Sequence, residues 1–150
     1  MIDRDANRLE VARRLGATDC IDIMQADPVA EIMTLTDQTG VDCAIEAVGV
    51  PATFELCEAI VAPGGTIANV GVHGVKADLH LEKLWDRNIA ITTRLVDTVS
   101  TPMLLKTVRA GRIDPAKLIT HRFRLDDIIN AYDTFGRAAE SHALKVIIEM

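Results

Sequence analysis

The chain has 150 residues, 49% of them apolar and 25% charged, which is typical of one ordinary globular domain and argues against disorder. Its formal net charge is -6 and its basic residues are scattered, so we expect no nucleic-acid partner. The apolar runs are far shorter than the roughly 20 residues of a membrane span, and residues 1–5 lack the features of a signal peptide, so we expect a cytoplasmic protein without a membrane partner.

Hydrophobic spacing and turn residues predict that strands and helices alternate along the chain. This alternation is typical of an α/β fold with a parallel sheet. In the first half of the chain the pattern predicts the end of a strand at 1–3, a helix over 6–15 closed by Gly16, a strand over 18–23, a helix from Asp27-Pro28 to Gly40, a strand over 41–49, a helix from Pro51 to a turn at 63–65, and a strand over 66–72. In the second half it predicts a β-rich run at 88–93, a helix over 101–108, a strand over 118–123, a helix over 126–135 and a strand over 144–148. In the helix over 126–135, we expect Ile128, Ile129 and Tyr132 to point inward.

The run at 41–49 is apolar apart from two acids, as in a strand that is buried on both faces of a parallel sheet. With the helix and strand that follow, it predicts a right-handed parallel crossover. Ligands of such sheets lie beyond the carboxyl ends of the strands, where the backbone approaches closely only if side chains are absent. Gly49 and Gly71, which stand at two of these ends, therefore mark the expected site.

Several stretches together, in this order and spacing, resemble one protein family. The chain is similar to the C-terminal half of a zinc-dependent medium-chain alcohol dehydrogenase of the bacterial secondary-alcohol type, and the resemblance covers essentially all 150 residues. The stretches that carry it are Asp3-Arg4-Asp5 with Arg8-Leu9 and Leu15-Gly16-Ala17-Thr18, Gly40-Val41-Asp42 with Glu46-Ala47-Val48-Gly49, Pro63-Gly64-Gly65-Thr66 with Val70-Gly71-Val72, and Ile119-Thr120-His121-Arg122-Phe123.

The resemblance implies a Rossmann-type parallel sheet that is truncated at its N-terminal side. Residues 1–110 would form a partial NAD-binding domain without the first strand and the Gly-x-Gly-x-x-Gly turn. Residues 111–150 would form a strand, helix and strand that return to the family's catalytic domain. That domain supplies the catalytic zinc ligands in the family, and they are not among these residues.

The family's cofactor contacts map onto several positions of this chain. Asp3 matches an acid that accepts hydrogen bonds from the adenosine ribose and favours NAD over NADP, and the alternative role for Asp3 is a cap of the following helix. Arg4 and Arg8 would lie near the adenine and the ribose or remain solvated. The resemblance further places packing and backbone contacts at Ala47, Val48, Gly49, Val70, Gly71 and Val72, carboxamide contacts at Thr93, Arg94 and Leu95, and a pyrophosphate contact at Lys145.

The histidines and cysteines show no metal-binding pattern. The four histidines lack ligand spacing and do not cluster with Cys20, Cys43 and Cys57. An odd cysteine count argues against a disulfide framework, so we expect reduced, mostly buried thiols. The sequence predicts no zinc site and no catalytic residue in this chain.

We therefore expect the cofactor-binding part of an NAD-dependent, zinc-containing alcohol dehydrogenase, which oxidises a small-molecule alcohol that the sequence does not identify. One alternative is an inactive fragment that serves as a structural or interaction protein, and another is a zinc-free relative similar to quinone reductases. Alone, the chain is expected to hold no zinc, to oxidise no alcohol and to bind NAD weakly at best. In the family the edge at residues 88–96 pairs with a two-fold mate, which predicts a homo-oligomer.

Overall fold

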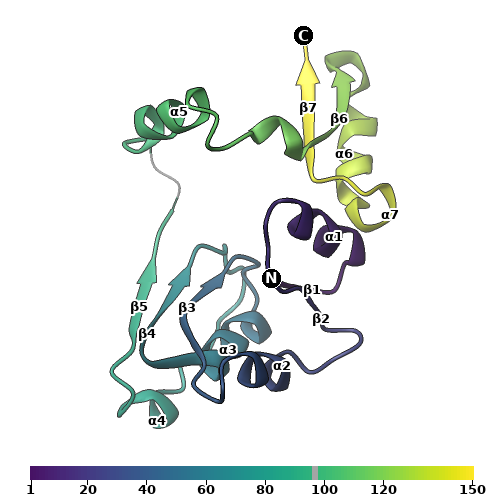
Figure 1. Cartoon of the computed structure of the whole chain (residues 1–150). Helices are drawn as coiled ribbons and strands as arrows, with labels where there is room; N and C mark the ends of the chain where they lie inside the picture. Colours follow the sequence, from purple (N-terminus) through teal and green to yellow (C-terminus); the bar gives the residue numbers. More distant parts are fainter. Residues whose placement is uncertain (96–97) are drawn as a thin grey trace. The chain divides into compact units, whose positions relative to one another are not determined.

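The computed structural model describes residues 1–95 and 98–150 (Figure 1). The chain divides into two compact units, of which one comprises residues 1–22 and 97–150 and the other residues 23–96. Every pair of neighbouring strands in the described residues is parallel, and helices connect the strands. The expected α/β class with parallel sheets is thereby confirmed.

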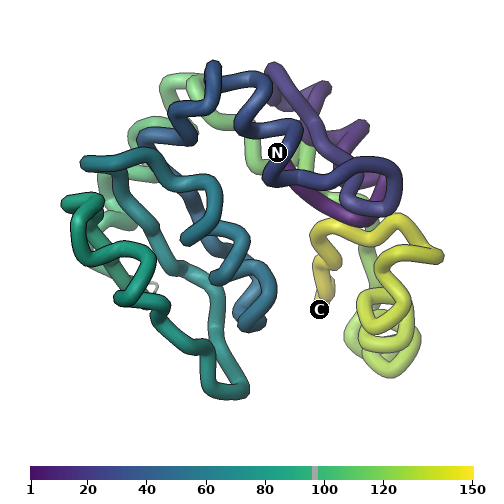
Figure 2. Tube along the Cα trace, turned by 90° about the horizontal axis from the view of Figure 1, so that it is seen from below, coloured from purple at the N-terminus to yellow at the C-terminus, as the bar shows by residue number. Residues whose placement is uncertain are grey.

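The unit of residues 23–96 holds a three-stranded sheet in the order β3-β4-β5. In Figure 2, α3 runs alongside β3 and β4, the two strands that it connects. Ile67 and Val61 on the central strand are completely buried and anchor the core. The elements are α2 (Pro28–Leu35), β3 (Val41–Glu46), α3 (Pro51–Ile60), β4 (Val61–Asn69), α4 (Leu81–Leu84) and β5 (Ala90–Thr93).

The helices of this unit begin where the sequence predicts. Asp27 is the N-cap of α2, its carboxylate accepts a hydrogen bond from the amide of Val29, and Pro28 occupies the first turn. The ends differ from expectation, since α2 ends at Leu35 and not at Gly40. The turn expected at 63–65 lies within β4 as an irregularity of the register opposite β3.

The prediction that residues 41–49 form a strand buried on both faces is wrong. β3 ends at Glu46 and lies at the edge of its sheet, with α3 packed against it. Ala44 and Glu46 are buried, whereas Cys43 and Ile45, which point to the opposite face, are exposed. The strand therefore alternates like one that is covered on a single face.

The cysteine prediction is confirmed only in part. All three thiols are free, but only Cys57 is buried, while Cys20 is half-buried and Cys43 exposed. Burial on α3, reinforced by the nearby carboxylate of Glu46, raises the pKa of Cys57 to about 11.

The other unit begins with a strand, a helix and a strand: β1 (Ile2–Asp3), α1 (Ala6–Arg14) and β2 (Ile21–Asp22). In this segment of the unit, the buried apolar residues are Leu9 and Ile21. As predicted, a strand ends at Asp3 and the helix is followed by Gly16. β2 is shorter than the predicted strand over 18–23.

The C-terminal part of this unit comprises α5 (Thr101–Arg109), β6 (Ile119–Arg124), α6 (Ile128–Gly136), α7 (Ala138–Ser141) and β7 (Lys145–Glu149), with short 3-10 turns at Pro115–Leu118 and Leu125–Asp127. The predicted inward face of α6 is wrong at Ile129 and Tyr132, which are 71% and 72% exposed, whereas Ile128 is half-buried. The small side chain of Ala131 is buried instead, which lets α6 approach β6 and β7 closely.

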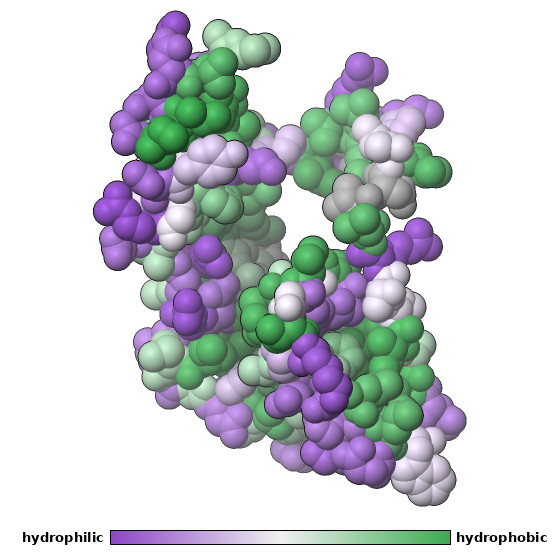
Figure 3. Space-filling view, turned by 180° about the vertical axis from the view of Figure 1, so that it is seen from behind, coloured by the Kyte–Doolittle hydropathy of each residue, from purple (hydrophilic) through white to green (hydrophobic). Residues whose placement is uncertain are grey.

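Many large apolar side chains are exposed in the described residues, and Figure 3 shows green apolar patches between hydrophilic ones on one face. No helix among the described residues is long and apolar enough to cross a membrane.

Candidate functional site

The carboxylate of Glu46 organises the turn at the end of β3. Glu46 is 1% exposed. Its Oε1 accepts hydrogen bonds from the backbone amides of Val48 and Gly49, both at 2.8 Å, and from the hydroxyl of Thr53 at 2.6 Å. One carboxylate oxygen thus joins the turn at residues 47–49 to the first turn of α3.

The same residue also holds the turn that follows β4. Its backbone carbonyl accepts hydrogen bonds from the amides of Val70 at 2.8 Å and Gly71 at 3.1 Å. A strand at 66–72 was predicted, but β4 ends at Asn69, so residues 70–73 leave the sheet beside the turn at 47–49.

Gly49 and Gly71 allow these two turns to meet. A Cβ at Gly49, where φ is +87°, would lie 2.3 Å from the carbonyl oxygen of Val72. A Cβ at Gly71 would lie 2.1 Å from Glu46 Oε2 and 2.4 Å from the amide nitrogen of Gly49. The close approach that the glycines permit is therefore between the two turns themselves.

His73 closes the second turn onto the first. Its Nε2 lies 2.9 Å from Asn69 Oδ1 and 3.3 Å from Glu46 Oε2, and its ring is nearly perpendicular to that of Phe54, with the ring centroids 6.2 Å apart. Asn69 also donates a hydrogen bond to the carbonyl of Gly71 at 3.2 Å. Sequence reasoning missed this polar network, although an acid near the end of an apolar strand was a visible signal for it.

Glu46 is held in its charged form. Burial alone would raise its pKa, but the hydrogen bonds from Thr53, Gly49 and Val48, with the neighbouring His73, hold the pKa of this carboxyl below its ordinary value. The site thus contains a buried carboxylate that orders the first turn, on a residue whose backbone carbonyl orders the second.

The cofactor residues predicted in this unit gather at the carboxyl ends of its three strands. Val48 and Val72 are 66% and 79% exposed, and Val70 and Leu95 are exposed as well. Thr93 pairs in register with Asn69, so the end of β5 lies beside the end of β4. The structure therefore places exposed apolar side chains and ordered backbone along one edge of the sheet.

The remaining predicted residues belong to the other unit. Asp3 Oδ1 accepts hydrogen bonds from the amides of Arg4 at 2.8 Å and Asp5 at 3.0 Å, but the N-cap of α1 is Asp5. Arg8 lies with them, its Nε 3.8 Å from the carboxylate of Asp5. Lys145 begins β7 in a different sheet.

The described residues do not fit a zinc ion. In residues 1–95 and 98–150, no group of three or more His, Cys, Asp or Glu side chains is placed to hold a metal.

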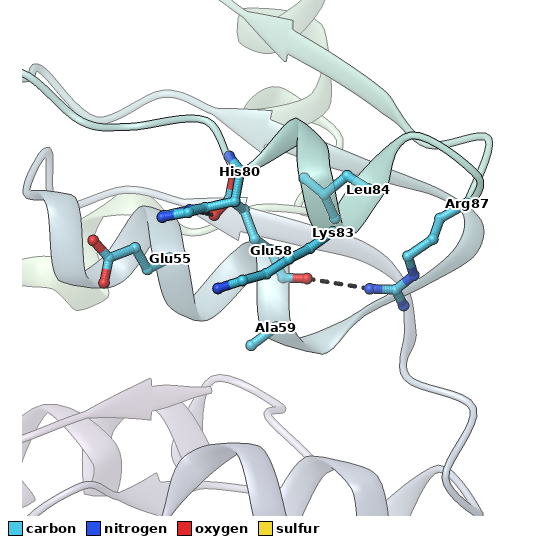
Figure 4. A pocket seen from close by; sticks show the side chains of 7 residues that line it. All are labelled: Glu55, Glu58, Ala59, His80, Lys83, Leu84 and Arg87. Atoms are coloured by element: carbon cyan, nitrogen blue, oxygen red, sulfur yellow. Dashed lines mark hydrogen bonds and ion pairs between the residues drawn. The ribbon is translucent and has the colours of Figure 1, made fainter.

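A second polar cluster lies between α3 and α4, where a crevice of about 260 Å³ is lined by Glu55, Glu58, Ala59, His80, Lys83, Leu84 and Arg87 (Figure 4). Glu58 is buried, and its carboxylate binds both the backbone amide of His80 at 3.0 Å and His80 Nδ1 at 2.7 Å. Arg87 donates hydrogen bonds to the carbonyls of Glu58 and Val61. The bonds of Glu58, His80 and Arg87 tie the segment before β5 to α3 and to the start of β4.

This cluster predicts a loss of stability at alkaline pH. The hydrogen bond to Glu58 raises the pKa of His80 above its unfolded value, so its contribution is fully present below about pH 6.5 and is lost as pH rises through the folded pKa. We expect urea unfolding to show a larger difference between the wild type and His80→Gln at about pH 5.5 than at about pH 9. Glu58→Gln should remove the same pH dependence, and an equal difference at both pH values would contradict the assignment.

The chain is similar in sequence to a known protein family and to several of its members. A family model described as zinc-binding dehydrogenase matches residues 1–108. The chain is 36% identical over 152 residues to an alcohol dehydrogenase of Cupriavidus necator, covering 99% of this chain and 41% of that protein. It is 31% identical to a sorbitol dehydrogenase of Bacillus subtilis, covering 97% of this chain and 41% of that protein.

A solved structure shares the fold in detail. The apo form of a zinc-dependent alcohol dehydrogenase 2 from Streptococcus pneumonia matches with a TM-score of 0.93 and 51% identity, covering 99% of this chain and 43% of that one. The chain thus spans about two fifths of the length of the relatives that it matches.

Proposed function

The chain belongs to the zinc-binding dehydrogenase family, and from this premise we propose that it is the cofactor-binding part of an NAD-dependent, zinc-containing alcohol dehydrogenase. The proposed reaction is oxidation of an alcohol to an aldehyde or ketone, with NAD as the hydride acceptor. Two similar proteins are named alcohol and sorbitol dehydrogenases, which supports an alcohol substrate over a quinone. Because the described residues offer no zinc site, no metal-dependent step is assigned to them.

One observation carries the proposal. Val48, Val70 and Val72 are exposed at the carboxyl ends of parallel strands, on turns whose backbone is fixed by Glu46. Cofactor sites of parallel α/β sheets lie at this edge and combine apolar surfaces with a few ordered polar groups. The exposed valines would pack on the nicotinamide half, with Thr93 and Leu95 beside it.

The residues of the other unit would serve the adenosine half. Asp3 lies at the end of a parallel strand, where its carboxylate would accept ribose hydroxyls, with Arg4 and Arg8 nearby. Lys145 would contact the pyrophosphate. The affinity of the chain alone should be weak, because its sequence contains no Gly-x-Gly-x-x-Gly turn.

We also propose self-association through the edge that begins at Asn88. β5 is exposed along its whole length and lies at the end of its sheet, and an unpaired strand edge favours pairing with a second copy. Val96, the last residue of the predicted edge, is outside the described residues.

Titration of the 150-residue chain with NADH and NADPH, followed by cofactor fluorescence, tests the proposal. We expect weak but saturable binding with a preference for NADH, and loss of the Asp3 carboxylate in Asp3→Asn should reduce that preference about tenfold. The asparagine can still accept the hydrogen bonds of the Asp3 turn, and Asp19→Asn controls for net charge. Absence of saturable binding would refute the proposed function, whereas binding with unchanged preference would leave Asp3 as a turn residue only.

A further inference from the structure

The two turns at the carboxyl edge are not held by side-chain burial. Val48, Val70 and Val72 are all exposed, so their packing contributes little to the conformation of residues 47–49 and 70–73. The contacts that do fix these turns are polar and converge on Glu46.

Glu46 reaches both turns through different atoms. Oε1 orders the first turn through two amides, and the backbone carbonyl orders the second through the amides of Val70 and Gly71. Oε2 faces His73 Nε2 at 3.3 Å and Gly71. A change in the position of this carboxylate would therefore move the first turn directly and the second turn through its contact with His73.

His73 connects the second turn back to Glu46 and to α3. It belongs to the second turn, yet its ring lies against Phe54 of α3 and between Asn69 and Glu46. The ring thus joins the end of the second turn to the helix that follows the first. Replacing both partners of a buried ion pair with apolar residues of similar volume often costs little stability, so a specific geometry is the better explanation for a charge here.

We propose that Glu46 and His73 are a positioning pair that sets cofactor affinity by holding the two turns in one fixed arrangement. This inference rests on the proposed function, because it assumes that these turns face the cofactor. The proposal includes no contact of either side chain with the reacting atoms. Their effect passes through the backbone of residues 48–49 and 70–71.

Backbone amide hydrogen exchange of the cofactor-free chain measures how firmly the two turns are held. Glu46→Gln keeps an acceptor oxygen but loses the charge, and we expect exchange about tenfold faster at Val48 and Gly49, whose amides the side chain binds. Glu58→Gln is the matched control, since Glu58 is also buried and bonded to a histidine but lies at the crevice beside α4. It should change these amides less than about twofold. The amide of Ile67 reports whether the core of each variant remains folded.

NADH titration then measures the consequence. Glu46→Gln and His73→Ala should each weaken binding about tenfold, because disordered turns must be ordered on binding. His73→Gln, which restores a donor near Glu46 and Asn69, should recover most of that loss. Wild-type affinity in Glu46→Gln and His73→Ala would overturn the positioning role and leave the proposed function intact. A wild-type chain that binds no NADH would refute both.

Discussion

Replacing Gly49 with alanine should destabilise the unit of residues 23–96 by about 3 kcal/mol or more. The new Cβ would lie 2.3, 2.6 and 2.8 Å from three backbone atoms of Val72, and φ at this position is +87°. Backbone cannot rotate away as a flexible side chain can, so the two turns must separate. Chemical unfolding of the variant, followed by circular dichroism, measures this loss.

Gly64→Ala is the matched control for this experiment. Gly64 has a similar φ of +79°, but nothing lies within 4 Å of an added Cβ. It should therefore show only the cost of a left-handed conformation, about 1 to 2 kcal/mol. Equal destabilisation of the two variants would mean that the approach of Gly49 to Val72 is not tight in solution.

Glu46→Ala should cost about 3 kcal/mol at neutral pH, because the amides of Val48 and Gly49 and the hydroxyl of Thr53 would lose their acceptor at a buried position. Glu55→Ala, at an exposed glutamate of α3, should change stability by less than about 0.5 kcal/mol. Similar losses in the two variants would contradict the importance of the buried network.

The same variant should reveal the lowered pKa of Glu46. The stability that the ionised carboxylate contributes is present above its unfolded pKa of about 4.3 and is lost as pH falls through the lower folded value. The difference in unfolding free energy between wild type and Glu46→Ala should therefore shrink in acid. A difference that grows in acid would show that the pKa is raised instead.

Local sequence signals predicted helix starts and ends well where a single residue determines them. Asp27 with Pro28 begins α2, Pro51 begins α3, and Gly16 follows α1, because caps and fixed φ angles depend on near neighbours. Burial was predicted less well, since it depends on what packs from elsewhere. For that reason the burial predicted for both faces of β3 was wrong at Ile45, and the inward face predicted for α6 was wrong at Ile129 and Tyr132.

The candidate site was predicted in position but not in chemistry. The ends of β3 and β4 and their glycines follow from the order of apolar runs. The contacts of Glu46 with Thr53 and His73 cannot be predicted from that order. Thr53 is 7 positions from Glu46, His73 lies on the turn after β4, and only the fold brings the three side chains together. The spacing of the histidines gives no metal site, and nothing in it predicts that His73 contacts a carboxylate.

The unequal burial of the three thiols makes the chain selective toward alkylating reagents. Cys57 is buried and its pKa is about 11, so almost none of it is the reactive thiolate near neutral pH. Cys20 is half-buried, and its Sγ lies 3.5 Å from the carbonyl of Leu9. Cys43 is exposed on the uncovered face of β3, so a maleimide dye would attach there first. A label at this position, three residues before Glu46, would report optically on the edge where the two turns meet.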